Sequence, residues 1–373
     1  MSEKVRLIRL GIVGCGDVTE LRHLPALRHV CGVKVSALSD IDTARLERVA
    51  ARFGVAARYT DYRELIENAE IDAVAVCVPP RLHTEAVLAA LSAGKHVLIE
   101  KPLALSLEEC DLLMAQAAAH ASLKAMVGFN LRWHRFALAA KEIIRRGELG
   151  DIKLARTVFT SGVRLGDNFA EWRRSRQTGG GALCELGVHH FDLLRFLFEK
   201  DFEEVSASSL SQDETAIVAA RMKDGPHVVS AFCEGTGENH ELEIYGARGW
   251  LRVSFYRADG LERFGAKQYA GSLKSRLRGL ARTLLEAPRI IRQARQGGDV
   301  PASYAEQWRH FIEAIALDSP VSCNLFDGRR ALEVALAAWE ATSTKQTVRL
   351  CQTTTVDRAN DWRSRGIAHS GNA

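Results

Sequence analysis

GIVGCGDVT, residues 11–19, joins an apolar run that begins at Leu7 to a helical pattern. Gly14 permits a tight turn after the strand, and Gly16 lets backbone amides approach a pyrophosphate. Asp17 and Val18 open the following helix, whose N-terminus favours the charge of a phosphate. Thr19 replaces the third glycine of the usual G-x-G-x-x-G pattern, so a side chain must fit between helix and strand. We predict a dinucleotide-binding turn here.

The residues around this turn alternate short β-branched runs with helical patterns. We expect strands at 7–13, 33–38, 73–78, 97–99 and 125–129, and helices at 42–53, 81–93 and 107–119. This alternation is typical of βαβ units. It predicts a doubly wound parallel sheet of the Rossmann type, an NAD(P)-binding domain over residues 1–127.

Asp40 lies at the end of the second expected strand. A carboxylate there accepts hydrogen bonds from both ribose hydroxyls and repels a 2′-phosphate, which favours NAD over NADP. Arg45 is near enough in sequence to weaken that preference, so NADP stays open. The alternative is that Asp40 only caps the helix that starts near Asp42.

Two later strand ends should meet the same edge of the sheet, where such sheets bind ligands. They are VPPRLH, residues 78–83, and IEKP, residues 99–102. The candidate cofactor contacts among them are Pro79, Pro80, His83, Glu100 and Lys101. The double proline is also typical of a simple turn before a helix. Lys101 is the most specific candidate for a catalytic role, because a lysine at a buried strand end can stabilise an oxygen that becomes anionic.

From residue 152 the pattern becomes strand-rich. We expect strands at 153–159, 204–209, 216–221, 227–234, 242–245 and 250–254, and helices at 136–146, 179–198, 304–317 and 328–343. This predicts a second α/β domain over 128–350, with an open, mostly antiparallel sheet, and a polar tail over 351–373.

The apolar helix predicted at 179–198 contains the main candidate catalytic residues of the second domain. Glu185, His189 and Asp192 are spaced i, i+4 and i+7, which puts them on one helical face. A histidine with a carboxylate one turn away suits a general base near neutral pH, although a satisfied core histidine is the alternative. No second histidine lies four residues from His189, so we predict no metal site. The absence of a G-x-S-x-G turn disfavours a Ser-His-Asp hydrolase.

Composition narrows the function classes. The 373 residues are 47% hydrophobic and 26% charged, which disfavours a disordered or coiled-coil chain, and a net charge of +4 is too small to predict nucleic-acid binding. Eight cysteines without a CxxC pair predict free thiols in a reducing compartment. No signal-peptide pattern and no stretch of eighteen apolar residues occur, so we expect a cytoplasmic protein without a membrane partner.

One segment stands apart from this plan. Residues 273–295 hold seven basic residues and one acidic residue, with Leu273, Leu277, Leu280 and Leu284 at helical spacing. We expect a basic amphipathic helix broken near Pro288, and a solvated surface segment is favoured over a membrane or polyanion contact. Binding of a nucleotide-sugar diphosphate through Arg276, Arg278 and Arg282 is a further hypothesis.

These motifs resemble the family of glucose–fructose oxidoreductase and inositol dehydrogenase, known as Gfo/Idh/MocA. The resemblance covers nearly the whole chain and rests on GIVGCGDV, SALSD, CVPPRLHTEAVLAALSAGKHVLIEKPLAL, WRRSRQTGGGALCELGVHHFDLL and FIEAIALDSPVSCNLFDGRRALEVALAAWEA. It implies a Rossmann domain followed by a C-terminal α/β domain whose open sheet supports homodimers or homotetramers.

The resemblance also implies roles for residues. Lys101 would lie by the nicotinamide and substrate, with a cis peptide bond at Lys101–Pro102. His189 matches the family's catalytic histidine in a D-x-G-x-H pattern, in which Glu185 replaces the usual Asp. Trp172 and Arg173 precede the glycine turn at which relatives close over cofactor or substrate.

The implied reaction is hydride transfer between the nicotinamide and a secondary hydroxyl or ketone of a sugar, cyclitol or sugar nucleotide. His189 would take the hydroxyl proton, Lys101 would stabilise the alkoxide, and Glu185 would orient His189 or hold a neighbouring hydroxyl. Two alternatives stay open: a redox-neutral, NAD-dependent glycosidase-type enzyme, and a non-catalytic regulator that binds NAD or sugar. Retention of Lys101 and His189 speaks against the regulator.

Overall fold

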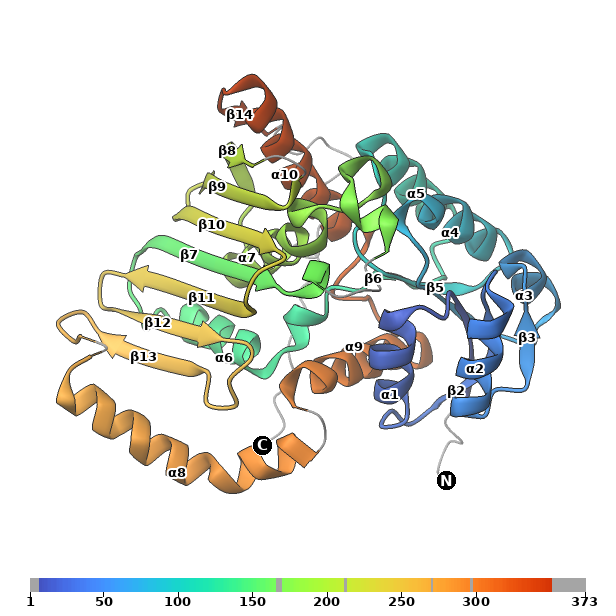
Figure 1. The fold of residues 1–373 in the computed structure, drawn as a ribbon, viewed down its shortest axis with the longest axis horizontal. Coiled ribbons are helices and arrows are strands. Elements are labelled where there is room, and N and C mark those ends of the chain that lie inside the picture. The colour runs from blue at the N-terminus through green and yellow to red at the C-terminus, as the bar shows by residue number, and fades with distance from the viewer. Residues whose placement is uncertain (1–6, 166–169, 211–212, 270, 296–297, 351–373) are drawn as a thin grey trace.

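The chain folds around two sheets that lie next to each other (Figure 1). A computed structural model describes residues 7–165, 170–210, 213–269, 271–295 and 298–350. The first sheet belongs to the N-terminal part and the second, larger sheet to the C-terminal part. The predicted fold class, a parallel Rossmann sheet followed by a mostly antiparallel sheet with helices, is confirmed. The polar tail expected at 351–373 lies outside the described residues.

The N-terminal sheet has six parallel strands in the order β3-β2-β1-β4-β5-β6. Its strands are β1 (Ile8–Val13), β2 (Val33–Ser39), β3 (Ala57–Tyr59), β4 (Ala73–Val76), β5 (His96–Ile99) and β6 (Ala125–Val127). The strands are buried Val, Ile, Leu and Ala runs, as expected for a sheet with helices on both faces. The order reverses between β1 and β4, and ligands of such sheets bind at that reversal.

Short helices connect these strands. They are α1 (Leu24–Leu27), α2 (Thr43–Phe53), α3 (Tyr62–Asn68), α4 (His83–Ser92) and α5 (Leu107–Ala119). Local capping explains where two of them begin: the Asp42 carboxylate accepts the Arg45 amide in the first turn of α2, and Ser106 with Glu109 forms a capping box on α5. The analysis of the sequence missed β3 and α3, because three and seven residues are too few to show a period.

The second sheet has eight strands in the order β13-β12-β11-β7-β10-β9-β8-β14, and only β7 and β10 pair in parallel among the described strands. The strands are β7 (Ile152–Ser161), β8 (Phe202–Ser209), β9 (Thr215–Met222), β10 (His227–Glu234), β11 (Asn239–Gly246), β12 (Gly249–Ser254), β13 (Leu261–Gly265) and β14 (Val348–Arg349). The covering helices are α6 (Arg135–Arg145), α7 (Val188–Phe198) and α10 (Leu325–Thr344), whereas α9 (Asp299–Ala316) lies against α1 of the N-terminal domain. Alternate side chains such as Val218 and Val228 are buried against them, whereas Ile217 and Val229 lie exposed on the opposite face.

The segment predicted to break near Pro288 is instead one helix, α8 (Leu273–Arg295). A proline in a helix removes one amide donor, but its φ is already helical, so the helix can continue past it. Among the described residues, no helix combines the length and apolarity that crossing a bilayer needs. The seven cysteines of the described part are all free thiols.

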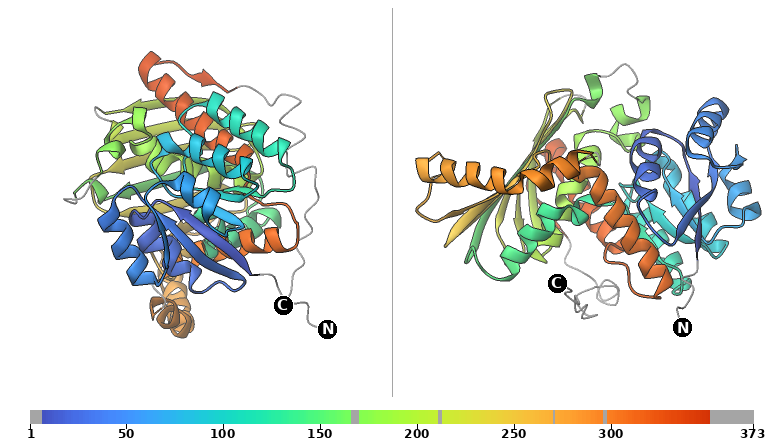
Figure 2. Two further views of the ribbon diagram at one scale, coloured as in Figure 1. Left: turned by 90° about the vertical axis from the view of Figure 1, so that its right-hand side faces the viewer. Right: turned by 90° about the horizontal axis from the view of Figure 1, so that it is seen from below.

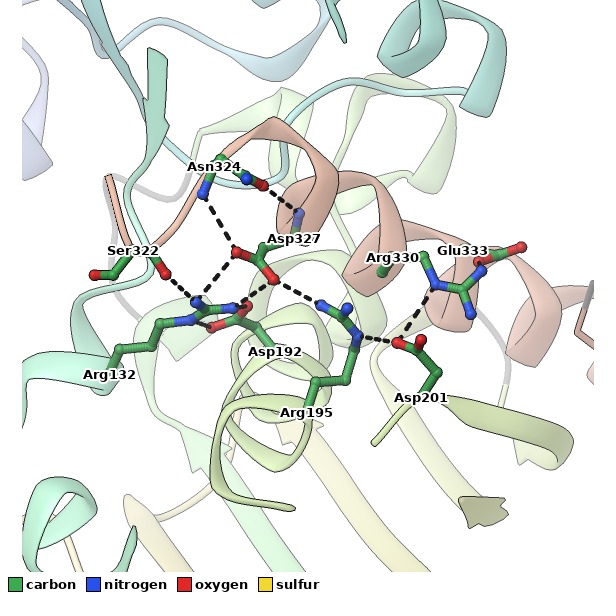
Figure 3. A network of polar contacts seen from close by, with 9 residues as sticks. All are labelled: Arg132, Asp192, Arg195, Asp201, Ser322, Asn324, Asp327, Arg330 and Glu333. Atoms are coloured by element: carbon green, nitrogen blue, oxygen red, sulfur yellow. Dashed lines mark hydrogen bonds and ion pairs between the residues drawn. The ribbon is translucent and has the colours of Figure 1, made fainter. Parts of the chain in front are cut away.

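A buried ion network joins the chain between the sheets to helices α7 and α10 (Figure 3). The Arg132 guanidinium donates to the Asp192 carboxylate at 2.7 Å and lies 3.0 Å from Asp327. Arg195 donates to the same Asp327 at 3.0 Å and to Asp201 at 2.7 Å. Arg132, Asp192, Arg195 and Asp327 are all nearly inaccessible to solvent. This network holds α7, which carries candidate site residues, in a defined place.

Candidate active site

The glycine-rich turn after β1 has the form that a dinucleotide requires. Gly14 has a φ of +97°, and a Cβ there would lie 2.3 Å from the carbonyl oxygen of Cys77. Gly16, in contrast, has open space where its Cβ would point, next to the first turn of the helix at Asp17 and Val18. The buried Thr19 hydroxyl donates to the Gly14 carbonyl oxygen at 2.6 Å. This hydrogen bond accommodates the side chain at the third fingerprint position.

Asp40 lies against the same turn. One oxygen of its carboxylate accepts the Cys15 amide at 2.7 Å, and the other accepts the Asp42 amide at 2.8 Å. The Arg45 guanidinium approaches Asp40 at 3.4 Å. Asp40 therefore links the glycine turn to the start of α2, with a cation beside it, at the edge where the ribose of a dinucleotide would bind.

The double proline packs against the second domain. Pro80 is buried, and a Cβ on Gly179 would lie 2.6 Å from its ring. His83 is fully buried below this loop, and its ring nitrogens lie 2.8 Å from the Pro102 carbonyl oxygen and 2.9 Å from that of Val78. Burial lowers the pKa of His83 despite these two carbonyls. His83 thus ties the two strand-end loops together from below.

Glu100 connects the end of β5 to both domains. Its buried carboxylate accepts a hydrogen bond from His23 at 2.9 Å and one from the Lys101 amide at 3.1 Å. Burial alone would raise the pKa of Glu100, but the bonds from His23 and the Lys101 charge lower it. The indole of Trp308, on α9, donates to the other His23 nitrogen at 3.0 Å. Because an indole N–H can only donate, Nδ1 of His23 accepts that bond, which leaves Nε2 to donate to Glu100.

His23 and Trp308 were missed by the analysis of the sequence. They are 285 residues apart, and a single sequence holds no signal for such a contact.

Lys101 and Glu185 meet across the boundary between the two domains. The Lys101 ammonium donates to the Glu185 carbonyl oxygen at 3.1 Å and lies 3.7 Å from its carboxylate. The Arg173 guanidinium lies 3.1 Å from the same carboxylate oxygen. The Lys101–Pro102 peptide bond is cis, as expected from the resemblance. Glu185 therefore stands between two cations that come from different segments.

Trp172 and Arg173 lie on a short 3-10 turn, η5 (Glu171–Arg174). The Arg173 guanidinium sits 5.4 Å from the centre of the Trp172 ring. A Cβ on Gly180 would lie 2.1 Å from the Arg173 carbonyl oxygen, so the glycine lets this turn approach the start of α7 closely. The Nε of Arg173 is enclosed and has no partner within the described part of the chain.

His189 sits near the start of α7, in partial contact with solvent. Its ring meets the edges of Phe129, at 6.0 Å between centroids, and Phe159. Burial lowers its pKa well below the ordinary histidine value, and the charges of Lys101 and His190 act in the same direction. His189 is therefore neutral at physiological pH. Its Nδ1 is enclosed without a hydrogen-bond partner among the described residues.

The regular α-helical register predicted through Glu185, His189 and Asp192 does not hold at Glu185. Residues Leu183–Gly187 form a π-helical turn, η7, before α7 begins. The wider turn shifts the register between Glu185 and the two later residues. Glu185 points to Lys101 and Arg173, Asp192 is bound by Arg132, and in the described part of the chain neither carboxylate hydrogen-bonds His189.

His190, which follows His189 in α7, pairs with His240 of β11. The Nε2 atoms of His190 and His240 are 2.8 Å apart, and the His240 ring stacks on Phe159 at 3.9 Å. Burial lowers the pKa of His190 to about 3, so this pair is neutral. Within the described residues no group of three or more His, Cys, Asp or Glu side chains is arranged to hold a metal ion.

Comparison with known proteins adds to this geometry. Residues 8–129 match a family model described as "Oxidoreductase family, NAD-binding Rossmann fold", named GFO_IDH_MocA, and residues 141–350 match its "C-terminal alpha/beta domain". The myo-inositol 2-dehydrogenase of Thermotoga maritima is 27% identical over 92% of this chain and 98% of its own length. The dTDP-3,4-didehydro-2,6-dideoxy-alpha-D-glucose 3-reductase of Saccharopolyspora spinosa is 32% identical over 66% of this chain and 74% of its own.

The fold has close counterparts among solved structures. Scyllo-inositol dehydrogenase from Lactobacillus casei, with bound NAD(H) and scyllo-inositol, superposes with a TM-score of 0.74 at 22% identity. The superposition covers 92% of this chain and 99% of that one. The two-domain architecture described above is thus shared along nearly its full length.

Proposed function

The chain belongs to the Gfo/Idh/MocA oxidoreductase family, whose N-terminal domain is an NAD-binding Rossmann domain, and from this we propose that it transfers a hydride between NAD and a secondary hydroxyl or ketone of a sugar, cyclitol or sugar nucleotide. One observation carries the proposal: Lys101 from the first domain meets Glu185 from the second, and the Lys101 charge acts on the neutral His189 one helical turn further on.

The residues present fit a dinucleotide. Gly16 leaves space at the helix start, where a side chain would obstruct a phosphate. Gly14 allows the tight turn that places Gly16 at this position. Asp40 offers a carboxylate for the ribose hydroxyls, while Pro79 and Pro80 close the neighbouring loop. We propose that these residues, with Glu100, Lys101, Trp172 and Arg173 toward the second domain, hold NAD. Arg45 beside Asp40 leaves some use of NADP open.

When bound, the nicotinamide supplies the acceptor or donor of the hydride. Lys101 Nζ would donate to the substrate oxygen and stabilise its negative charge as the proton leaves. His189 would accept that proton. Because Nδ1 of His189 is enclosed, we assign Nε2 as the atom that reaches the substrate hydroxyl.

Glu185 has a different proposed task from the orientation of His189. Its carboxylate lies within reach of the Lys101 and Arg173 cations at once, and its carbonyl oxygen accepts a bond from Lys101. We propose that Glu185 places the Lys101 ammonium and offers its remaining lone pairs to a hydroxyl next to the reacting carbon. Polyhydroxylated substrates suit such a site, since each extra hydroxyl needs both a donor and an acceptor.

The names of the relatives support this substrate class. They include an inositol dehydrogenase, a reductase that acts on a nucleotide-linked sugar, and a glucose-6-phosphate 3-dehydrogenase. Figures 1 and 2 show α8 well away from β5, so we do not propose that its arginines contact the substrate.

Assembly and location are further proposals. The outer face of the second sheet presents Ile217 and Val229, which are 59% and 41% exposed, and a homodimer or homotetramer formed through this face would cover them. Light scattering would measure the assembly. We propose a cytoplasmic location, with domains at 1–127 and 128–350.

The test is the appearance of reduced-nicotinamide absorbance when the purified protein and NAD, or NADP, meet a panel of inositols, sugars and sugar nucleotides. We expect NAD-dependent signal with at least one cyclitol or sugar. If no compound of the panel gives reduced nicotinamide, but NAD is released when the protein is denatured, the redox-neutral glycosidase-type enzyme is favoured. If no compound is converted but a sugar binds, a non-catalytic regulator is favoured.

A further inference from the structure

Helix α8 forms a surface that the proposed reaction does not use. It follows β13, the edge strand of the second sheet, and lies along the outside of the molecule, away from the Rossmann sheet (Figures 1 and 2). Its 23 residues make it the longest described helix. We call its leucine stripe Leu273, Leu277, Leu280 and Leu284, which recur at four- and three-residue spacing.

The leucine stripe faces away from the protein. Its four side chains are between 57% and 74% exposed, and Ile291, two turns further along the same face, is 55% exposed. The residues of α8 that are less exposed, Gly279, Thr283 and Ala287, follow a neighbouring face of the helix. The Thr283 hydroxyl on that face donates to the Asp259 carboxylate at 2.8 Å. The helix is thus held by its flank, with the apolar stripe about a quarter turn from the contact.

Helix α8 carries a large excess of positive charge. The segment 273–295 carries Lys274, Arg276, Arg278, Arg282, Arg289, Arg292 and Arg295 against the single acid Glu286. The net charge of this segment, +6, exceeds the formal net charge of the whole chain, +4, so the rest of the chain is slightly negative. A patch of that sign is complementary to an anionic surface.

We propose that α8 docks the protein on a lipid bilayer that carries anionic headgroups. An exposed leucine stripe on a helix rich in Lys and Arg is the pattern by which helices lie in the plane of a membrane interface, the leucines entering the acyl boundary and the cations meeting the headgroups. Such a helix needs no transmembrane length. The proposal does not depend on the substrate or the reaction.

A second copy of the chain is the competing occupant of the leucine stripe. Two α8 helices brought together by their stripes would place two sets of seven basic residues side by side, which costs free energy through repulsion of like charges. An anionic bilayer covers the same leucines and neutralises the charge at once. The charge pattern therefore favours the bilayer.

The experiment is flotation of the full-length protein with vesicles of phosphatidylglycerol and phosphatidylcholine, compared with vesicles of phosphatidylcholine alone. We expect recovery with the anionic vesicles only, and loss of recovery as salt is raised, because the attraction is partly electrostatic. Leu277→Ser/Leu280→Ser/Leu284→Ser should lower recovery at least tenfold. Leu317→Ser, which changes a leucine that is 75% exposed at the end of α9, is the matched control and should float like the wild type.

Three outcomes would overturn the proposal: no flotation with either vesicle, equal flotation with both, or flotation of the triple variant at the wild-type level. A change of oligomer size in the triple variant, measured by light scattering without vesicles, would also overturn it, because the stripe would then cover a second copy. Unchanged thermal unfolding of the triple variant checks that these exposed substitutions leave the fold intact.

Discussion

The Lys101 ammonium lies 3.1 Å from the carbonyl oxygen of Glu185 and 3.7 Å from its carboxylate, so this ion pair connects the two domains at the candidate site. Lys101 lies in the loop just after β5, and Glu185 belongs to the π-helical turn before α7. This pair is the structural basis of the proposed active site.

Removing the charge of Glu185 should impair catalysis more than shortening it does. In Glu185→Gln the Lys101 and Arg173 cations lose the carboxylate between them, and we expect kcat to fall about 100-fold. Glu185→Asp keeps the charge and should stay within about tenfold of the wild type. Steady-state kinetics with a substrate found in the panel would measure both. Equal losses in the two variants would show that length rather than charge matters.

His189 should remain neutral across the physiological pH range. Its pKa is held well below 6.5 by burial and by the Lys101 charge, so the folded protein binds no proton there as pH falls through the ordinary histidine range. The unfolded chain does bind one, and stability contributed by this group is therefore lost as pH falls below about 6.5. An NMR titration of the His189 ring would measure its pKa. In Lys101→Met the pKa of His189 should rise. An unchanged pKa would show that the charge of Lys101 does not act on His189.

Asp40 should set the preference for NAD. Asp40→Ser removes the carboxylate that favours ribose hydroxyls and opposes a 2′-phosphate, and we expect kcat/KM with NAD to fall about tenfold while that with NADP rises. Arg45→Ala should move the preference the other way, since Arg45 lies 3.4 Å from Asp40. Kinetics with both cofactors would test this. A loss with NAD and no gain with NADP would mean that Asp40 serves only the turn, through its bond to the Cys15 amide.

The buried network around Arg132 should contribute strongly to stability. Arg132→Met leaves the Asp192 and Asp327 carboxylates without their shared cation, and we expect the free energy of unfolding to drop by about 3–5 kcal/mol. Arg145→Met removes an exposed pair with Glu142 and should leave the free energy of unfolding nearly unchanged, because water screens such a pair. Urea denaturation would compare the two. A loss below about 1 kcal/mol in Arg132→Met would contradict this role.

Much of this architecture follows from local patterns in the sequence. The glycine turn at 14–16, the strand before it and helices such as α5 are each specified by neighbours a few residues apart, and they were predicted within one to three residues at their ends. Lys101 and Asp40 could be assigned to one edge of the sheet for the same reason, because each follows a strand of a parallel sheet. These features are local in the chain.

The contacts that organise the site are not local. Whether Glu185 faces His189 or Lys101 depends on a π-helical turn, which a regular helical spacing does not reveal. The bond between His23 and Trp308, and the sharing of Asp327 by Arg132 and Arg195, join residues more than one hundred positions apart. One sequence without relatives shows which residues can pair, but it does not show which of them do.

The central claim is that Lys101 and His189 together move the proton of a substrate hydroxyl while NAD is bound at the glycine turn. The most direct test measures NAD reduction by wild type, Lys101→Met and His189→Asn with one cyclitol or sugar, alongside NAD binding by fluorescence titration. We predict that each variant loses at least about 1,000-fold in kcat and binds NAD with an affinity within about tenfold of the wild type. Full turnover in either variant, or loss of NAD binding that accounts for the loss of activity, would contradict it.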